Sequence, residues 1–141
     1  MRKLFLISAL LLAFAGVINA QEVQYLSQEE FRKTIFDYST ETEWNYKGNM
    51  PCIIDFYYTW CGPCKRLSPI MDELAKEYKG KVRFYKVDAE KENGLSGAFG
   101  IHSCPTILLV TKDKKARPYM VSGLRPKEDW VKWIDEVLLG K

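Results

Sequence analysis

Cys61 and Cys64 are the residues whose types and spacing most directly suggest chemistry. Two thiols three positions apart share one face of a helix's first turn, where they can form and break a disulfide. The same spacing also serves metal sites and structural bridges. A zinc site would need two more ligands, which His102 and Cys104 would supply only by coincidence. We interpret the pair as a redox-active dithiol, with a structural disulfide or a metal site as the alternatives.

The cysteine pair falls between a predicted strand and a predicted helix. Residues 51–58 form a short apolar run rich in β-branched and aromatic side chains, which is typical of a buried strand. Residues 65–78 carry apolar side chains at the spacing of an amphipathic helix: Leu67, Ile70, Met71, Leu74 and Tyr78. Cys61 then lies at the helix start, where unpaired N–H groups and the helix dipole favour a thiolate. Cys64, one turn further in, is expected to be more buried.

These segments resemble a known family. Residues 54–65, Ile-Asp-Phe-Tyr-Tyr-Thr-Trp-Cys-Gly-Pro-Cys-Lys, resemble the active-site signature of the thioredoxin family. Residues 99–106, Phe-Gly-Ile-His-Ser-Cys-Pro-Thr, are similar to the family segment that contains its cis-proline. Further features at familiar positions are Pro69, the segment 86–88 and Gly123. The resemblance extends over residues 24–139 and implies a thioredoxin-like α/β fold, with a central mixed β-sheet flanked by helices on both faces.

The resemblance implies a thiol-disulfide oxidoreductase that needs no cofactor or metal. The Cys61 thiolate would attack a disulfide of a partner protein, and Cys64 would then attack the Cys61 sulfur and release the reduced partner. Run backwards, the same steps oxidise a dithiol. The intervening pair, Gly62 and Pro63, is similar to that of the reducing members of the family. The expected substrate-binding residues are Trp60, Gly62, Pro63, Cys104 and Pro105.

Asp55 is a carboxylate within an otherwise apolar strand. Burial would raise its pKa and allow it to relay a proton for Cys64. The resemblance places the family's buried aspartate here and matches Lys86 to the lysine that pairs with it. The alternatives are an Asp at a strand edge facing water and an ordinary exposed strand lysine.

Trp60 and Pro105 are expected to contribute to the predicted site. The resemblance implies a cis peptide bond before Pro105 that exposes backbone groups to a substrate strand, whereas a trans loop proline is the alternative. Trp60 is expected to offer an apolar contact beside the cysteines, unless it is a core tryptophan.

Cys52 and Cys104 are two further cysteines in the chain. The family's sheet would place them at opposite ends of the central strand, more than ~20 Å apart. A disulfide needs Cα atoms within about 7 Å of each other. We therefore expect no disulfide between them and interpret Cys52 as a small buried hydrophobic residue. The resemblance implies that Cys104 faces the active-site thiols. There it would shift the redox potential, trap a partner or only pack.

The first 20 of the 141 residues read as a secretory signal peptide, with a basic start, an apolar stretch and a small residue, Ala20, at the cleavage position. An uncleaved anchor is the alternative, but a membrane span needs about 20 apolar residues. Cleavage would leave residues 21–141 as one domain. It would also remove Arg2 and Lys3 and no acid, so 21 basic groups become 19 against 18 acidic ones. Such near-neutrality argues against a nucleic-acid partner.

The rest of the chain predicts the order β-α-β-α-β-α-β-β-α. A strand at 23–26 precedes a helix capped by Ser27 and Glu30 that runs to Tyr38. A loop at 39–49 leads to the central strand. The later elements are a strand at 82–88, a short helix at 93–99, a hairpin of strands 106–111 and 117–122, and a helix from Pro126 with an apolar stripe.

Together these features predict a soluble, monomeric, periplasmic or secreted protein that reduces disulfides of other proteins. A membrane-embedded reductase is the electron donor that the resemblance implies, because the chain carries no pattern of an NADPH or flavin site. An oxidase or isomerase that uses the same dithiol is the second interpretation. A binding module, in which the disulfide only shapes a partner surface, is the third.

Overall fold

Residues 21–141 are described by a computed structural model. Its strands are β1 at Gln24–Tyr25, β2 at Cys52–Tyr57, β3 at Arg83–Asp88, β4 at Thr106–Val110 and β5 at Tyr119–Ser122. They form one sheet in the order β1-β3-β2-β4-β5. The strands β1, β3 and β2 run parallel, whereas β4 is antiparallel to β2 and β5 is antiparallel to β4. The sheet is mixed, as predicted, and the elements follow one another along the chain in the predicted order.

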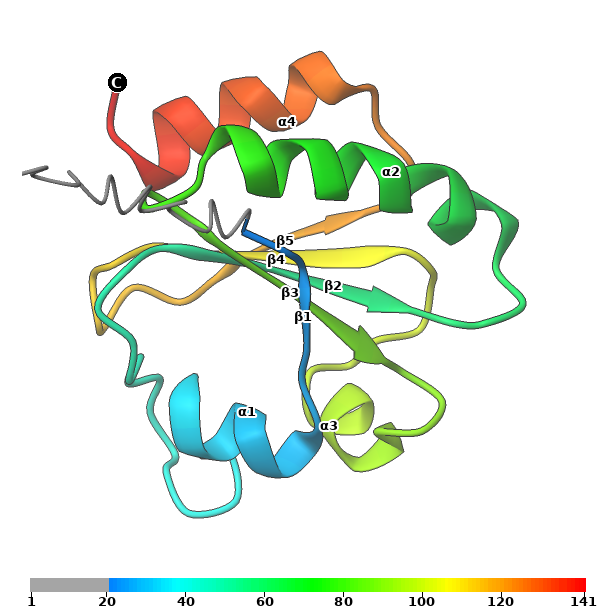
Figure 1. Cartoon of the computed structure of the whole chain (residues 1–141). Coiled ribbons are helices and arrows are strands. Elements are labelled where there is room, and N and C mark those ends of the chain that lie inside the picture. Colours follow the sequence, from blue (N-terminus) through cyan, green and yellow to red (C-terminus); the bar gives the residue numbers. More distant parts are fainter. Residues whose placement is uncertain (1–20) are drawn as a thin grey trace, which may run out of the picture.

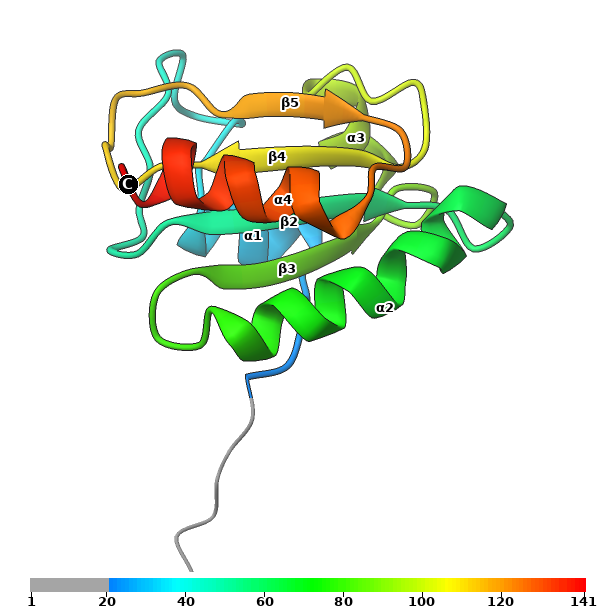
Figure 2. The same ribbon diagram turned by 90° about the horizontal axis from the view of Figure 1, so that it is seen from above.

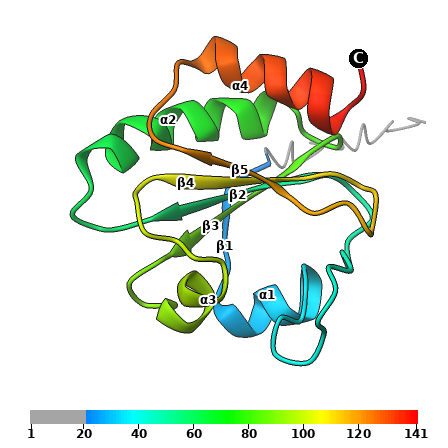
Figure 3. The ribbon, with the colours of Figure 1, turned by 180° about the vertical axis from the view of Figure 1, so that it is seen from behind.

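Helices cover both faces of this sheet. Their bounds are Gln28–Thr34 for α1, Gly62–Glu77 for α2, Asn93–Ala98 for α3 and Lys127–Trp133 for α4. Figure 1 shows α2 and α4 on one face and α1 with α3 on the other, and Figure 3 shows the same layers from behind. Viewed from above, α4 crosses over β2 and β4, whereas α2 runs alongside β3 (Figure 2). This three-layer arrangement confirms the predicted thioredoxin-like α/β class.

The side chains of β2 divide the interior into two cores. Ile53 packs in the cluster that contains Leu67 of α2 and Trp130 of α4, whereas Ile54 packs in the cluster that contains Phe31 of α1. Residues 52–56 are all buried, because a strand covered on both faces has no solvent-facing side. The active-site strand is therefore held from both sides.

The first helix is shorter than predicted. Its capping box is present, with the Ser27 side chain accepting from the Glu30 N–H and the Glu30 side chain accepting from the Ser27 N–H. However, α1 ends at Thr34 instead of Tyr38. The Asp37 carboxylate accepts hydrogen bonds from the N–H and hydroxyl of Ser39, which favours a turn over a further helical turn.

The last helix differs in another way. After α4 the chain continues as a π-helical turn at Ile134–Leu138, where the N–H of Leu139 donates to the Ile134 carbonyl. Trp130, Ile134 and Leu138 are buried, which confirms the predicted apolar stripe. The widened turn is a feature that the apolar spacing did not predict.

The predicted signal peptide, residues 1–20, lies outside the described residues. Among residues 21–141, no helix combines the length and the apolar character that crossing a membrane requires.

Candidate active site

The junction between β2 and α2 places the cysteine pair. Cys61 is the N-cap of α2, in an extended conformation, and its sulfur accepts the N–H of Cys64 at 3.2 Å. Pro63 follows within the first helical positions, where its missing N–H costs no hydrogen bond. No acidic residue lies in the first turn of α2, so no carboxylate there offsets the positive end of the dipole. This environment stabilises a thiolate on Cys61 in the reduced protein.

Cys61 and Cys64 form a disulfide, with their Cα atoms 5.3 Å apart. The expectation that Cys64 is the more buried of the two is wrong, since the exposed fractions are 2% for Cys61 and 5% for Cys64. The N–H of Cys61 donates to the Tyr58 carbonyl, and this turn folds Cys61 inward. A partner protein therefore meets the rim of the site before it reaches either sulfur.

Trp60 forms part of this rim. Its side chain is 67% exposed, which excludes the alternative of a core tryptophan. The indole lies against the Tyr58 ring, with ring centroids 5.0 Å apart. Trp60 thus offers an apolar surface directly beside Cys61.

The segment before β4 forms the opposite side of the site. The Cys104–Pro105 peptide bond is cis, as predicted. The Pro105 carbonyl accepts the N–H of Gly123, and the Thr106 hydroxyl donates to the Ser103 carbonyl, both at 2.8 Å. Thr106 is paired with Phe56 near the end of β2, so this segment lies at the sheet edge from which the chain leads to Cys61.

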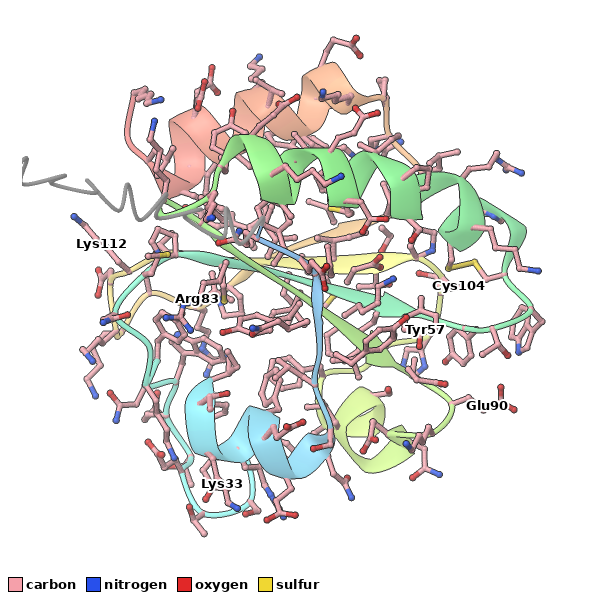
Figure 4. The ribbon with its side chains drawn as sticks, viewed as in Figure 1. Lys33, Tyr57, Arg83, Glu90, Cys104 and Lys112 are labelled. Carbon is pink, nitrogen blue, oxygen red and sulfur yellow. A yellow bond between two sulfur atoms is a disulfide. The ribbon has the colours of Figure 1, made fainter. Side chains whose placement is uncertain are left out.

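Cys104 lies next to the disulfide. Its sulfur and those of Cys61 and Cys64 are all within 4.8 Å of one another, and Figure 4 labels Cys104 beside the yellow disulfide bond. The side chain of Cys104 is partly buried and carries a free thiol. Cys104 therefore adds a third sulfur to the site.

Cys52 lies at the other end of β2. It is paired in register with Val110, the last residue of β4, whereas Cys104 precedes the first. Cys52 and Cys104 are both free, which confirms the prediction that they do not pair. Cys52 is also fully buried, as expected of a small hydrophobic residue.

Asp55 is buried in the middle of β2, with 4% of its surface exposed. Burial raises the pKa of Asp55 to about 7, and the charge of Lys86 opposes this shift. Its Oδ1 has no hydrogen-bond partner among the described residues. Alternation along the strand turns Asp55 to the same face as Ile53, toward the layer of α2 that carries Cys64. The alternative of an Asp facing water at a strand edge is excluded.

Lys86 is the register partner of Asp55 on β3. However, none of the ion pairs found among residues 21–141 includes Asp55. The Lys86 ammonium instead donates to the Ser68 hydroxyl at 3.4 Å and lies 5.1 Å from the ring centroid of Tyr25. The predicted pair is therefore a longer-range electrostatic contact and not an ion pair.

Ser68 and Tyr25 were missed in the sequence. Ser68 follows Cys64 by four positions and so shares its helix face, a spacing that could have drawn attention to it. Tyr25 is the register partner of Lys86 across the β1–β3 pair. The contact between the Tyr25 ring and the Lys86 ammonium depends on the register of β1 against β3, and the sequence of so short a strand does not predict that register.

Comparisons with known proteins agree with this geometry. The thioredoxin family profile matches residues 22–136. Thioredoxin from Borreliella burgdorferi is 49% identical over 92 residues, which cover 65% of this chain and 79% of that protein. Thioredoxin from Rickettsia felis is 37% identical over 90 residues, which cover 64% of this chain and 84% of that protein. A crystal structure of chloroplastic thioredoxin z superposes with a TM-score of 0.70 and 26% identity, covering 82% of this chain and 93% of that one.

The site and these likenesses lead to the same chemistry. A disulfide at a helix start, with a thiolate-stabilising environment, is the arrangement that dithiol-disulfide exchange requires. The chain spans most of the length of the two bacterial thioredoxins that it matches. The chain is therefore a protein-disulfide oxidoreductase and belongs to the thioredoxin family.

Proposed function

We propose that this protein is exported and reduces disulfides in other proteins through Cys61 and Cys64. The observation that carries the proposal is the Cys61–Cys64 disulfide at the start of α2. After reduction, the Cys61 thiolate attacks one sulfur of a partner's disulfide and the partner's other sulfur leaves as a thiolate. Cys64 then attacks Cys61, so the protein is oxidised and the partner leaves reduced.

Asp55 is the proton acceptor of the second step in this proposal. Cys64 must lose a proton to attack Cys61, and a buried carboxyl group with a pKa of about 7 exchanges protons near neutral pH. Lys86 keeps that pKa from rising further through its charge. The carboxylate and the lysine thus set the pH at which the mixed disulfide resolves.

The direction of electron flow is tested by the redox potential. The Gly62 and Pro63 pair supports the reducing direction, so we expect a potential near that of reducing thioredoxins, about −270 mV. Equilibration of the purified protein with glutathione or dithiothreitol mixtures gives the value. A potential above about −200 mV would instead support the oxidase or isomerase function.

Export rests on the composition of residues 1–20. Outside the cytoplasm the oxidised protein needs a source of electrons. A membrane-embedded reductase is the donor that we propose for the mature chain, which we expect to be soluble and monomeric. Fractionation of expressing cells followed by N-terminal sequencing tests the first point. We expect the protein outside the cytoplasm with Gln21 as its first residue, and an intact Met1 in the cytoplasmic fraction would contradict export.

The substrates are found by trapping. A variant with both Cys64→Ser and Cys104→Val leaves no other thiol beside Cys61, so mixed disulfides with partner proteins accumulate and are identified by mass spectrometry. The Cys61→Ser variant is the matched control, because it removes the attacking sulfur while the other thiol stays. Partners captured equally by both variants would contradict attack through Cys61.

A further inference from the structure

The sulfur of Cys104 stands within reach of both sulfurs of the redox disulfide. All three atoms lie within 4.8 Å of one another, and they come from two separate parts of the chain. Cys61 and Cys64 belong to the start of α2, whereas Cys104 belongs to the segment that precedes β4. Cys104 therefore approaches the disulfide from across the site instead of along the helix.

Cys104 has the accessibility that exchange chemistry needs. Its side chain is partly exposed, whereas the other free cysteine, Cys52, is fully buried at the far end of β2. A thiol-disulfide exchange requires a thiolate that reaches one sulfur of a disulfide. Each cysteine side chain has three staggered rotamers, so a change of rotamer is the movement that formation of a bond between neighbouring sulfurs requires. The geometry thus supplies a third reactant to a two-thiol site.

We propose that Cys104 is a second resolving thiol, a role that rests on the proposed exchange between Cys61 and a partner protein. When Cys61 is held in a mixed disulfide, the Cys104 thiolate attacks the Cys61 sulfur. A Cys61–Cys104 bond forms, the bond between Cys61 and the partner breaks, and the partner sulfur leaves as a thiolate that takes up a proton. The partner gains the two electrons that the protein's thiols lose, so no further oxidant is needed.

The ordinary disulfide returns by a second exchange. The Cys64 thiolate attacks Cys61, the Cys61–Cys64 bond forms, and Cys104 leaves as a thiolate and is protonated. The disulfide seen in the structure is therefore the end product of either route. Cys104 offers a way out of the mixed disulfide whenever a bound partner keeps Cys64 from attacking.

The first test uses the full-length mature protein with Cys64→Ser. Mild oxidation with diamide is expected to give a monomer with an internal Cys61–Cys104 disulfide, seen as a protected thiol pair after alkylation and as a linked peptide after digestion. The Cys64→Ser/Cys104→Val variant is expected to keep Cys61 free or to form dimers through it. The matched control, Cys64→Ser/Cys52→Ala, is expected to behave as Cys64→Ser. Alkylation of both Cys61 and Cys104 in the oxidised Cys64→Ser monomer would overturn the proposal.

The second test measures the resolving step itself. In the Cys64→Ser variant, Cys61 is converted to its mixed disulfide with thionitrobenzoate, and release of the chromophore is followed. An intramolecular thiol accelerates this release, so we expect it to be at least about tenfold faster than in Cys64→Ser/Cys104→Val. Equal rates in the two variants would refute a resolving role, provided that their thermal unfolding shows that both are folded.

The outcomes also separate this proposal from the proposed function. If the wild-type protein reduces insulin while Cys64→Ser forms no Cys61–Cys104 bridge, the second resolving thiol is refuted and the reductase function stands. If the bridge forms but the wild-type protein does not accelerate insulin reduction, the reductase function fails while the exchange between the three sulfurs stands.

Discussion

Asp55 and Lys86 lie opposite each other on adjacent parallel strands, yet the Lys86 ammonium donates its hydrogen bond to Ser68 of α2. The buried carboxyl group is thus left without a direct cationic partner, and burial raises its pKa to about 7. An ion pair would have the opposite effect and hold the carboxyl group ionised. This arrangement makes Asp55 the group whose protonation links the pH to stability and to the resolving step.

Replacement of Asp55 by Asn is expected to stabilise the protein at pH 8. At that pH the carboxyl group is ionised in both states, and the folded state bears the cost of a buried charge. Below the unfolded value of 3.8 the group is protonated in both states, so the cost vanishes. As the pH rises from about 4 to about 7, wild-type stability relative to Asp55→Asn should fall by about 2–4 kcal/mol.

Urea unfolding of both proteins at pH 4, 6 and 8 measures this effect. The difference in the free energy of unfolding is expected to be small at pH 4 and largest at pH 8. A difference that is independent of pH would show that folding does not shift the pKa of Asp55.

The same substitution is expected to slow the resolving step. Without the carboxylate, Cys64 loses its buried proton acceptor, and the rate at pH 7 should fall by about tenfold to a hundredfold. The wild-type rate should rise with pH around 7, and Asp55→Asn should lose that rise. Stopped-flow release of thionitrobenzoate from the Cys61 mixed disulfide gives both profiles, and superimposable profiles would contradict the assigned role.

Replacement of Lys86 by Gln tests the long-range contact. The positive charge lowers the pKa of Asp55, so its removal should move the rise in the resolving rate to higher pH. Lys112→Gln is a matched control, because Lys112 is an exposed lysine at the opposite end of β4 from the disulfide (Figure 4). A shift of equal size in both variants would mean that overall charge, and not Lys86, sets the profile.

Trp60→Ala is expected to weaken the capture of partners and leave the fold intact. The indole is 67% exposed, so its loss should cost little stability but should remove about 1 kcal/mol of partner contact, or roughly a fivefold rise in KM. Tyr119→Ala is the control, because Tyr119 is also an exposed aromatic but lies on β5. Steady-state kinetics with a protein substrate distinguish the two, and an unchanged KM for Trp60→Ala would exclude its role.

Ser27→Ala is expected to lower stability without changing the chemistry. The side chain caps α1 at the Glu30 N–H, and loss of such a cap costs about 1 kcal/mol. The redox potential should stay the same, because α1 covers the sheet face opposite α2 (Figure 1). A changed potential would mean that the two faces are coupled in a way that the structure does not suggest.

Local patterns in the sequence predicted the elements that hold the cysteine pair. The apolar run of β2 and the apolar spacing of α2 are strong signals, because a strand buried on both faces and an amphipathic helix each restrict residue types along their whole length. The positions of Cys61 and Pro105 followed from these elements and from the family resemblance. The early end of α1 and the π-helical turn after α4 depend on a few local hydrogen bonds, which periodicity does not report.

Relationships across the fold were harder to predict. Which of Cys61 and Cys64 is the more buried depends on the turn in which the Cys61 N–H donates to the Tyr58 carbonyl. The contact of Lys86 with Ser68 depends on how α2 packs against β3. The approach of Cys104 to the disulfide was inferred from the family resemblance alone. Spacing along the chain could not have predicted this approach, because Cys104 lies forty positions after Cys64.

Reduction of insulin by dithiothreitol tests the central claim most directly. The wild-type protein at catalytic concentration is expected to accelerate precipitation of the reduced insulin chains, whereas Cys61→Ser should give the rate of dithiothreitol alone. If the wild-type protein and Cys61→Ser give that same uncatalysed rate, exchange through Cys61 and Cys64 is not the activity of this protein.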